Sequence, residues 1–296
     1  MNGLFDLVGM RPPPPEPPAR PEKPGRDLPV LSLVLLALLV LGCLVFPLFL
    51  SKSPAYMDLS HPNTAPCGAF WFGTDAMGRD VFSMVWHGGR LSLCIGAGAA
   101  ALSAVFAIVF GAASGCAPGW LDALLMRLTE ILLSVPSLLL IVLLQAALGE
   151  ATVLSLSLVI GATGWTSIAK VVRTQVRQLR ASEYILAARA MGGGFFHILW
   201  RHLTPNLLPS ILFMVVMNIR GAIAAESTLS FMGIGLPLEV ITWGSMLSLA
   251  ENALLTGAWW IIVIPGAFLA GTLLCMTELG NYLQKTINRK ESNLLT

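Results

Sequence analysis

The chain has 296 residues, of which 55% are hydrophobic and only 11% are charged, and its mean hydropathy is +0.76. Soluble domains carry roughly 25% charged residues, so this composition excludes a water-soluble enzyme, and its abundant apolar surface excludes a wholly disordered chain. The formal net charge of +2 gives no indication of nucleic-acid binding. The composition therefore predicts an all-α integral membrane protein.

The first 27 residues form a polar segment, and residues 12–24 contain eight prolines. Such a stretch favours an extended polyproline II conformation without a packed core, so we expect a disordered tail. A ligand for an SH3-type domain is the alternative interpretation of this composition. Because the tail precedes the first apolar run, we expect no cleavable signal peptide at the start of the chain.

Six apolar runs approach or exceed the roughly 20 residues that a helix needs to cross a bilayer. They are Leu28–Ser51, Leu91–Leu121, Ile131–Gly149, Ala151–Ala169, Pro205–Gly235 and Asn252–Thr277. Backbone groups in lipid must bond to one another, so we expect six transmembrane helices. The resulting division is a tail (1–27), a first transmembrane helix (28–51), an external loop (52–90), a five-helix core (91–282) that includes the loop 170–204, and a C-terminal tail (283–296).

Basic residues are distributed unequally between the two sides of the predicted bundle. The N-terminal tail, the loop after the fourth span and the C-terminal tail are rich in lysine and arginine, whereas the other side has only Lys52, Arg79 and Arg90 near its helix ends. Cytoplasmic loops carry such an excess of positive charge. We therefore predict a multi-pass protein of the bacterial inner membrane with both termini in the cytoplasm.

Small residues recur in the second span, where Gly96, Gly98, Gly111 and Gly115 favour close approach of another helix. Packing inside the subunit and contact with another subunit are equally compatible with this pattern. In the third span Pro136 predicts a kink, because proline removes a helical hydrogen bond.

Two features distinguish the loop 170–204. Arg173, Arg177 and Arg180 recur at helical spacing and give the end of the fourth helix a basic face, which we interpret as an anchor at lipid headgroups. A short helix of small residues then ends at three consecutive glycines from Gly192. Within it, Tyr184 and Arg189 are residue types that anchor protein interfaces. A helix–turn–helix that docks in a groove of another protein is the functional interpretation, and an amphipathic loop arising by chance is the alternative.

The same loop resembles the cytoplasmic EAA loop of ATP-binding-cassette importer permeases. The correspondence is Leu186-Ala187-Ala188 for the first triplet, Gly192 for the glycine and Pro205 for the proline, in register, with leucine in place of the usual glutamate. Three strings resemble the branch that imports oligopeptides, dipeptides or nickel. The first string runs from Glu183-Tyr184 through Ala187-Ala188-Arg189 to Pro205-Asn206. The second is Gly73-Thr74-Asp75-Ala76-Met77-Gly78-Arg79-Asp80, and the third runs from Glu226 to Gly235. The resemblance covers roughly residues 30–285 and is closest to the second of the two permease subunits.

This resemblance implies a type I importer permease (MetI-like) fold with a cytoplasmic coupling helix. Its partners would be a second homologous permease subunit, two ATPase subunits, an extracytoplasmic solute-binding protein and membrane lipid, with no nucleic acid. The residues implied to dock on the ATPase are Glu183, Tyr184, Ala187, Ala188, Arg189, Gly192 and Pro205. The residues Gly73, Asp75, Arg79 and Asp80 would either contact the binding protein or cap the external mouth.

The sequence itself lacks a phosphate-binding loop of the form G-x-x-x-x-G-K-[ST]. We therefore expect no enzymatic activity, no catalytic residue and no cofactor in this chain, with ATP bound by partner subunits. The five cysteines and the isolated histidines have no metal-ligand spacing, so no metal site is predicted.

Two ionisable residues interrupt the fifth span, and such residues are costly enough in lipid to suggest function. Arg220 and Glu226 lie six positions apart, which puts them on different faces of a helix and disfavours a direct ion pair. We expect Asn218, Arg220 and Glu226 to border the translocation path; a salt bridge to another helix or snorkelling to the interface is the alternative.

The predicted function is import of di- or oligopeptides delivered by the external binding protein. Nickel or another metal chelate is the alternative cargo for the same architecture. An ATP-independent secondary transporter is a more distant alternative, since it would be expected to contain inverted repeats and midplane carboxylates, which this sequence does not display.

Overall fold

The computed structural model describes residues 29–50, 53–182, 204–237 and 239–294. Regular secondary structure in these residues is helical, as predicted. The helices are α1 (Val30–Phe49), α2 (Val81–Cys116), α3 (Gly119–Ser134), α4 (Ser137–Leu148), α5 (Val153–Arg180), α8 (Thr204–Phe231), α9 (Trp243–Ser248), α10 (Ala250–Thr256) and α11 (Trp260–Leu294). Five of them are long and apolar enough to span a membrane, and the pair α3–α4 makes a sixth span if it is counted as one.

The third span is broken rather than continuous. Helices α3 and α4 meet at an angle of 92° around Val135 and Pro136. Val135 has φ −90° and ψ 130° because a residue that precedes proline is forced out of the helical region. The kink predicted at Pro136 is thus a sharp break. The boundaries predicted from Ile131 to Gly149 are wrong, since α3 begins at Gly119.

Helix α2 begins ten residues earlier than the uncharged run suggested. The Asp80 side chain accepts a hydrogen bond from the Phe82 amide and caps the helix at Val81. His87 and Arg90 lie within its first turns without ending it. At the other end of the chain, Gly257 with φ +70° stops α10. The last span therefore starts at Trp260 and not at Asn252.

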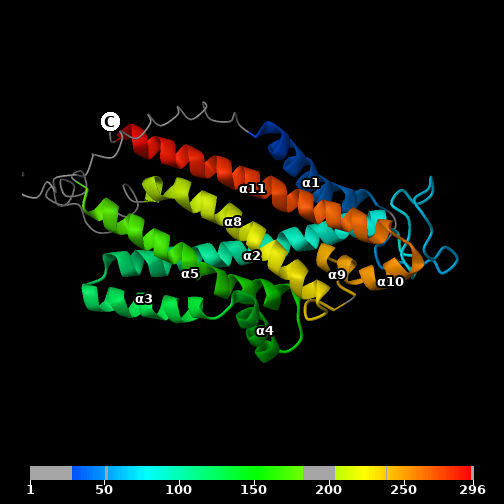
Figure 1. The fold of residues 1–296 in the computed structure, drawn as a ribbon, viewed down its shortest axis with the longest axis horizontal. Coiled ribbons are helices and arrows are strands. Elements are labelled where there is room, and N and C mark those ends of the chain that lie inside the picture. The colour runs from blue at the N-terminus through cyan, green and yellow to red at the C-terminus, as the bar shows by residue number, and fades with distance from the viewer. Residues whose placement is uncertain (1–28, 51–52, 183–203, 238, 295–296) are drawn as a thin grey trace, which may run out of the picture.

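Figure 1 shows α2, α5, α8 and α11 running along the length of the molecule, with α3 and α4 on one flank and α1 against α11. One end of this bundle carries residues 53–80, α9 and α10, and we call it the α9 end. The opposite end carries the last turns of α2, α5 and α11 and the first turn of α8. We call it the α5 end, because α5 leads from there into residues 183–203.

Glycine allows α2 and α5 to pack closely. A Cβ atom on Gly111 would lie 2.7 Å from both the Ala169 carbonyl oxygen and Val172 Cβ, and one on Gly115 would lie 2.8 Å from Val176 Cγ1. Gly96 meets Ile223 of α8 in the same manner, at 2.6 Å. The small residues of the second span therefore serve packing inside the subunit at these three positions.

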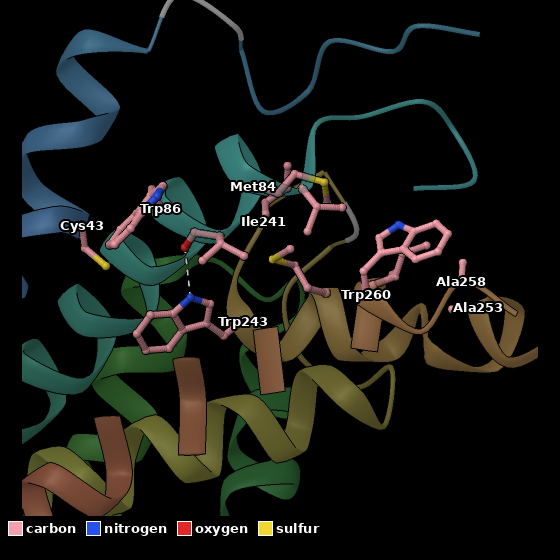
Figure 2. Packing of buried hydrophobic residues seen from close by; sticks show 12 residues of the cluster. Cys43, Met84, Trp86, Ile241, Trp243, Ala253, Ala258 and Trp260 are labelled. Carbon is pink, nitrogen blue, oxygen red and sulfur yellow. Dashed lines mark hydrogen bonds between the residues drawn. The ribbon is translucent and has the colours of Figure 1, made fainter. Parts of the chain in front are cut away.

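A cluster of buried aromatic and sulfur-containing residues joins α1, α2 and α9 at the α9 end (Figure 2). Trp243 is fully buried, and its indole Nε1 donates to the Val85 carbonyl oxygen at 3.0 Å. Trp86 packs against α1, where a Cβ on Gly42 would collide with its ring. These contacts fasten the short helix α9 to the long helix α2.

Candidate functional site

A groove of about 480 Å³ lies between α4, α5 and α8. None of the residues that line it carries a formal charge. The polar ones are Ser137, Thr163, Ser167 and Asn218, and the others are glycine, alanine, isoleucine, valine, methionine and phenylalanine. A neutral groove with a few hydroxyl and amide groups can accept backbone hydrogen bonds without selecting the charge of a ligand.

Asn218 joins the two long walls of this groove. Its Nδ2 donates to the Gly164 carbonyl oxygen of α5 at 3.2 Å. A Cβ on Gly164 would lie 2.9 Å from Ser103 Oγ, so a glycine here keeps α5 close to both α2 and α8. One turn along α8, a Cβ on Gly221 would have no atom within 4 Å, so this residue leaves the groove open. The prediction for Asn218 therefore falls on a residue that lines a groove.

Arg220 is half-buried and is not among the residues that line the groove. Its Nε is buried and has no hydrogen-bond partner in the part of the chain that the structure describes. Arg220 and Glu226 form no ion pair with each other, as their spacing predicted. A role for Arg220 in the translocation path stays a prediction.

Glu226 is completely buried and is surrounded by hydroxyl groups. Its carboxylate accepts hydrogen bonds from Thr242 (2.7 Å), Ser230 (3.0 Å), Ser92 (3.2 Å) and Ser227 (3.3 Å). These donors come from α2, from α8 itself and from the residue that caps α9. Glu226 therefore holds three elements together inside the subunit, and its place on the translocation path stays a prediction.

Ser92 and Thr242 complete this network and were not predicted from the sequence. Ser92 Oγ also accepts a hydrogen bond from the Trp243 amide at 3.3 Å, and Thr242 Oγ1 accepts one from the Ser245 amide at 3.1 Å. The available signal was Thr242 three residues before Ser245, a spacing typical of a helix N-terminus. Its proximity to Glu226 depends on tertiary structure.

The segment from Gly73 to Asp80 folds inward at the α9 end. Asp75 Oδ2 pairs with Arg79 Nε at 2.7 Å, while Asp75 Oδ1 accepts the amides of Met77 (2.9 Å) and Arg79 (2.8 Å). Both Asp75 and Arg79 are more than 90% buried. The carbonyl oxygen of Thr74 accepts the indole N–H of Trp260 at 3.0 Å.

Gly73 and Gly78 both have positive φ angles, and a Cβ at either would collide with backbone atoms of Thr64 or Asp58. Together with the helix cap at Asp80, these contacts favour a structural cap over a protein-binding surface for the string. Contact of Gly73, Asp75, Arg79 and Asp80 with a binding protein stays a prediction.

At the α5 end, Asp122 of α3 forms ion pairs with two arginines of α5. Arg173 Nε lies 2.5 Å from Asp122 Oδ1, and Arg177 Nη2 lies 2.6 Å from Asp122 Oδ2. Ser114 Oγ of α2 donates to the same carboxylate at 2.5 Å. Arg180 Nη1 donates to the Gly115 carbonyl oxygen at 2.9 Å.

These contacts give the three arginines a role inside the subunit, while their interpretation as headgroup anchors stays a prediction. Their common function is to hold the ends of α2, α3 and α5 together. The missed residue was Asp122, an acid between two apolar runs. Its position after Pro118 and Gly119, in a helical first turn, was the signal that could have identified it.

The coupling residues Glu183, Tyr184, Ala187, Ala188, Arg189 and Gly192 lie outside the described residues. Pro205 occupies the first turn of α8, as predicted for a proline that begins a helix. Among the described residues no cluster of histidine, cysteine, aspartate and glutamate is placed to hold a metal ion.

Comparison with known proteins gives a consistent result. Residues 107–290 match the family model of the binding-protein-dependent transport system inner membrane component. The chain is 33% identical to the dipeptide transport system permease protein DppC of Bacillus subtilis, over 90% of this chain and 82% of that protein. It is also 33% identical to the oligopeptide transport system permease proteins OppC of Bacillus subtilis (90% and 86% covered) and Haemophilus influenzae (88% and 84% covered).

Proposed function

The chain belongs to the family of binding-protein-dependent transport system inner membrane components, and from this we propose that it carries di- or oligopeptides across the membrane. It is a multi-pass permease subunit of an ATP-binding-cassette importer. The cargo is inferred from the relatives, which are named as permeases of dipeptide and oligopeptide systems. Their names favour peptides over nickel or a metal chelate.

The observation that carries the proposal is the uncharged groove between α4, α5 and α8. Peptides share a backbone of amide groups and differ in side-chain charge. A lining of hydroxyls and the Asn218 amide can bond to that backbone, while the absence of a fixed charge among the lining residues avoids selecting among side chains. A second homologous permease subunit facing this groove would close the path.

The assembly we propose contains two permease subunits, two ATPase subunits and an extracytoplasmic solute-binding protein. The excess of arginine and lysine orients the α5 end and both termini toward the cytoplasm. Residues 183–203 would then dock on an ATPase subunit, which supplies ATP binding and hydrolysis; this chain needs no cofactor of its own.

Helix α5 is suited to transmit movement from the ATPase, because it leads directly into residues 183–203. Asp122 and its two arginines join α5 to α3, and the glycine-lined contact joins it to α2. A displacement of the docked loop would therefore move these helices as one body and change the width of the groove on the other side of α5.

The test fills the groove at its open position. Gly221→Leu adds a side chain where the structure leaves space, so the subunit should fold while the path is obstructed. Gly271→Leu in α11 is the matched control, since Gly271 also has no atom within 4 Å of a Cβ. In the complete transporter, we expect peptide uptake to fall at least tenfold for Gly221→Leu and to stay near wild type for the control.

Uptake would be measured with a labelled dipeptide in proteoliposomes that contain ATP, with a nickel chelate as a parallel substrate. Normal peptide uptake by Gly221→Leu would remove the groove from the path. Transport of the nickel chelate without transport of any peptide would overturn the cargo assignment and leave the permease function in place.

A further inference from the structure

A second cavity of about 300 Å³ opens at the α5 end, where α2 stops and α3 starts. It is lined by Gly115, Ala117, Arg177, Arg180 and Ala181. The two long side chains are both arginines, and the remaining three residues are glycine or alanine. The cavity thus combines guanidinium hydrogen-bond donors with small residues that leave space for a ligand.

The charges around this cavity do not balance. Arg173 and Arg177 share the single carboxylate of Asp122, and the guanidinium group of Arg180 lies on the same helix one turn further along. Arg180 donates only to the neutral carbonyl oxygen of Gly115, and it has no carboxylate partner in the described part of the chain. Among the described residues, the three arginines thus exceed the nearby carboxylate by two positive charges, and an anion could balance this excess.

The neighbouring surface indicates which anion would balance them. The helix α3 starts two residues after Ala117 and turns apolar side chains outward, with Trp120 72% exposed and Leu124 and Leu128 half exposed. Tryptophan followed by a leucine face is typical of the boundary between lipid headgroups and acyl chains. The cavity therefore opens next to a surface suited to an acyl chain.

We propose that this cavity binds the phosphate group of an anionic phospholipid, with Arg177 and Arg180 as its ligands. Arginine forms paired hydrogen bonds with phosphate oxygens, and basic pockets between transmembrane helices hold anionic headgroups. The small residues Gly115, Ala117 and Ala181 leave space for the headgroup. The bound lipid would brace the junction of α2, α3 and α5 next to residues 183–203.

The proposal is independent of the cargo, because it concerns the lipid and not the groove. The complete transporter would be reconstituted in nanodiscs of phosphatidylcholine, with or without phosphatidylglycerol. Lipid retained after detergent extraction would be measured by native mass spectrometry, and thermal unfolding would be followed in parallel. Arg180→Gln removes the cation that has no carboxylate partner among the described residues, and Arg127→Gln is the control, since the Arg127 side chain is 79% exposed and pairs with Glu130.

For the wild type and Arg127→Gln, we expect phosphatidylglycerol to be retained preferentially over phosphatidylcholine and to raise the unfolding temperature. We expect Arg180→Gln to lose at least fivefold of this enrichment. Arg180→Lys keeps the positive charge but not the paired hydrogen-bond donors. This variant should retain an amount of phosphatidylglycerol between those of the wild type and Arg180→Gln. It also tests the proposal should the glutamine variant fail to fold.

Three results would overturn the proposal. Equal retention of phosphatidylglycerol by Arg180→Gln would remove the lipid from the cavity. Equal stabilisation by inorganic phosphate, without phosphatidylglycerol, would assign the cavity to a free anion. Loss of the ATPase subunits from Arg180→Gln with unchanged lipid retention would show that the cavity receives an acidic side chain of a partner protein.

Discussion

Two buried carboxylates occupy opposite ends of this bundle and are stabilised in different ways. Asp122 at the α5 end is neutralised by the guanidinium groups of Arg173 and Arg177. Glu226, toward the α9 end, has no cationic partner in the described part of the chain and accepts four hydroxyl hydrogen bonds instead. Each carboxylate joins three helical elements. Asp122 does so through ion pairs with cations, and Glu226 does so through hydrogen bonds from neutral hydroxyl groups.

The difference follows from how far the surroundings of each group are removed from solvent. Arg173 and Arg177 are partly exposed, with side chains 23% and 45% accessible, so their charges are only partly removed from water. Arginines around Glu226 would have to be desolvated completely, which costs several kcal/mol per ion. Hydroxyl groups satisfy the carboxylate oxygens at a much lower cost.

The largest expected effect comes from replacing Asp122, which pairs with Arg173 and Arg177 at the α5 end. Asp122→Leu leaves two neighbouring guanidinium groups without a counter-ion, and removal of one partner of a buried pair typically costs about 3–5 kcal/mol. Because both arginines retain some solvent, we expect a loss of about 3 kcal/mol. Thermal unfolding of the purified transporter in detergent measures the change.

Two companion variants sharpen this result. Asp122→Leu combined with Arg173→Met removes one of the stranded charges and should recover about half of the lost stability. Glu130→Gln breaks the exposed pair with Arg127 and should cost less than about 0.5 kcal/mol. Equal stability of Asp122→Leu and Glu130→Gln would show that the contacts of Asp122 with α2 and α5 contribute no more to the free energy of unfolding than a surface ion pair does.

A smaller effect is expected from the hydroxyl shell of Glu226. Thr242→Val removes the shortest of the four hydrogen bonds and also the side chain that caps α9. Loss of one partner of a buried polar group costs about 1–3 kcal/mol, and the remaining hydroxyls can compensate in part, so we expect a loss of about 2 kcal/mol.

Thr228→Val is the matched control for Thr242→Val. Thr228 lies on the exposed side of the same helix as Glu226, and its hydroxyl donates only to the Ala224 carbonyl oxygen within that helix. We expect a change close to zero in the same unfolding measurement. A Thr242→Val variant as stable as the control would mean that the three serines alone satisfy Glu226.

The contrast between the two ends also explains what could be predicted from the sequence. Hydropathy located five helices of spanning length and the broken pair α3–α4, because the bilayer imposes the length of an apolar run, and the motif strings identified the family. The partners of Glu226 lie up to 134 positions away along the chain, and the arginine partners of Asp122 lie more than 50 positions away. Such pairs depend on how the helices pack, so no local pattern indicated them.

For a related reason, the charge pattern did not reveal that the arginines of α5 bond inside the subunit. A basic helical face at a membrane boundary has the same periodicity whether it contacts headgroups or a neighbouring carboxylate. Asp122 was overlooked because it lies between two apolar runs, and spans delimited by charged residues treat such an acid as a boundary. Similarly, the inward orientation of Asp75 and Arg79 follows from Gly73 and Gly78 at positive φ, which a motif string does not reveal.

The smallest expected effect concerns a third carboxylate, Asp58, which makes the same kinds of bond in the solvent-accessible loop at the α9 end. Hydrogen bonds from the Ser60 hydroxyl and from His61 hold the pKa of Asp58 below its usual value. A depressed pKa means that the stabilisation is present above the ordinary pKa of about 4 and is lost as the pH falls through the lower value in the fold. Acidification below about pH 4 should therefore release the backbone around residues 58–61.

Hydrogen exchange of the amides in residues 53–62 measures this release. Ser60→Ala removes the main donor, so we expect the amides to become exposed at a higher pH than in the wild type. Ser53→Ala removes only the long hydrogen bond from the Ala55 amide, so it should leave the pH at which residues 58–61 are released unchanged. Water reaches the Asp58 carboxylate and can replace the hydrogen bond that Ser60→Ala removes. The loss of protection should therefore stay within residues 53–62. We infer that Asp122 and Glu226 stabilise the bundle because they are buried as well as hydrogen-bonded. If Ser60→Ala, which affects only a solvent-accessible carboxylate, unfolded the whole protein, that inference would be wrong.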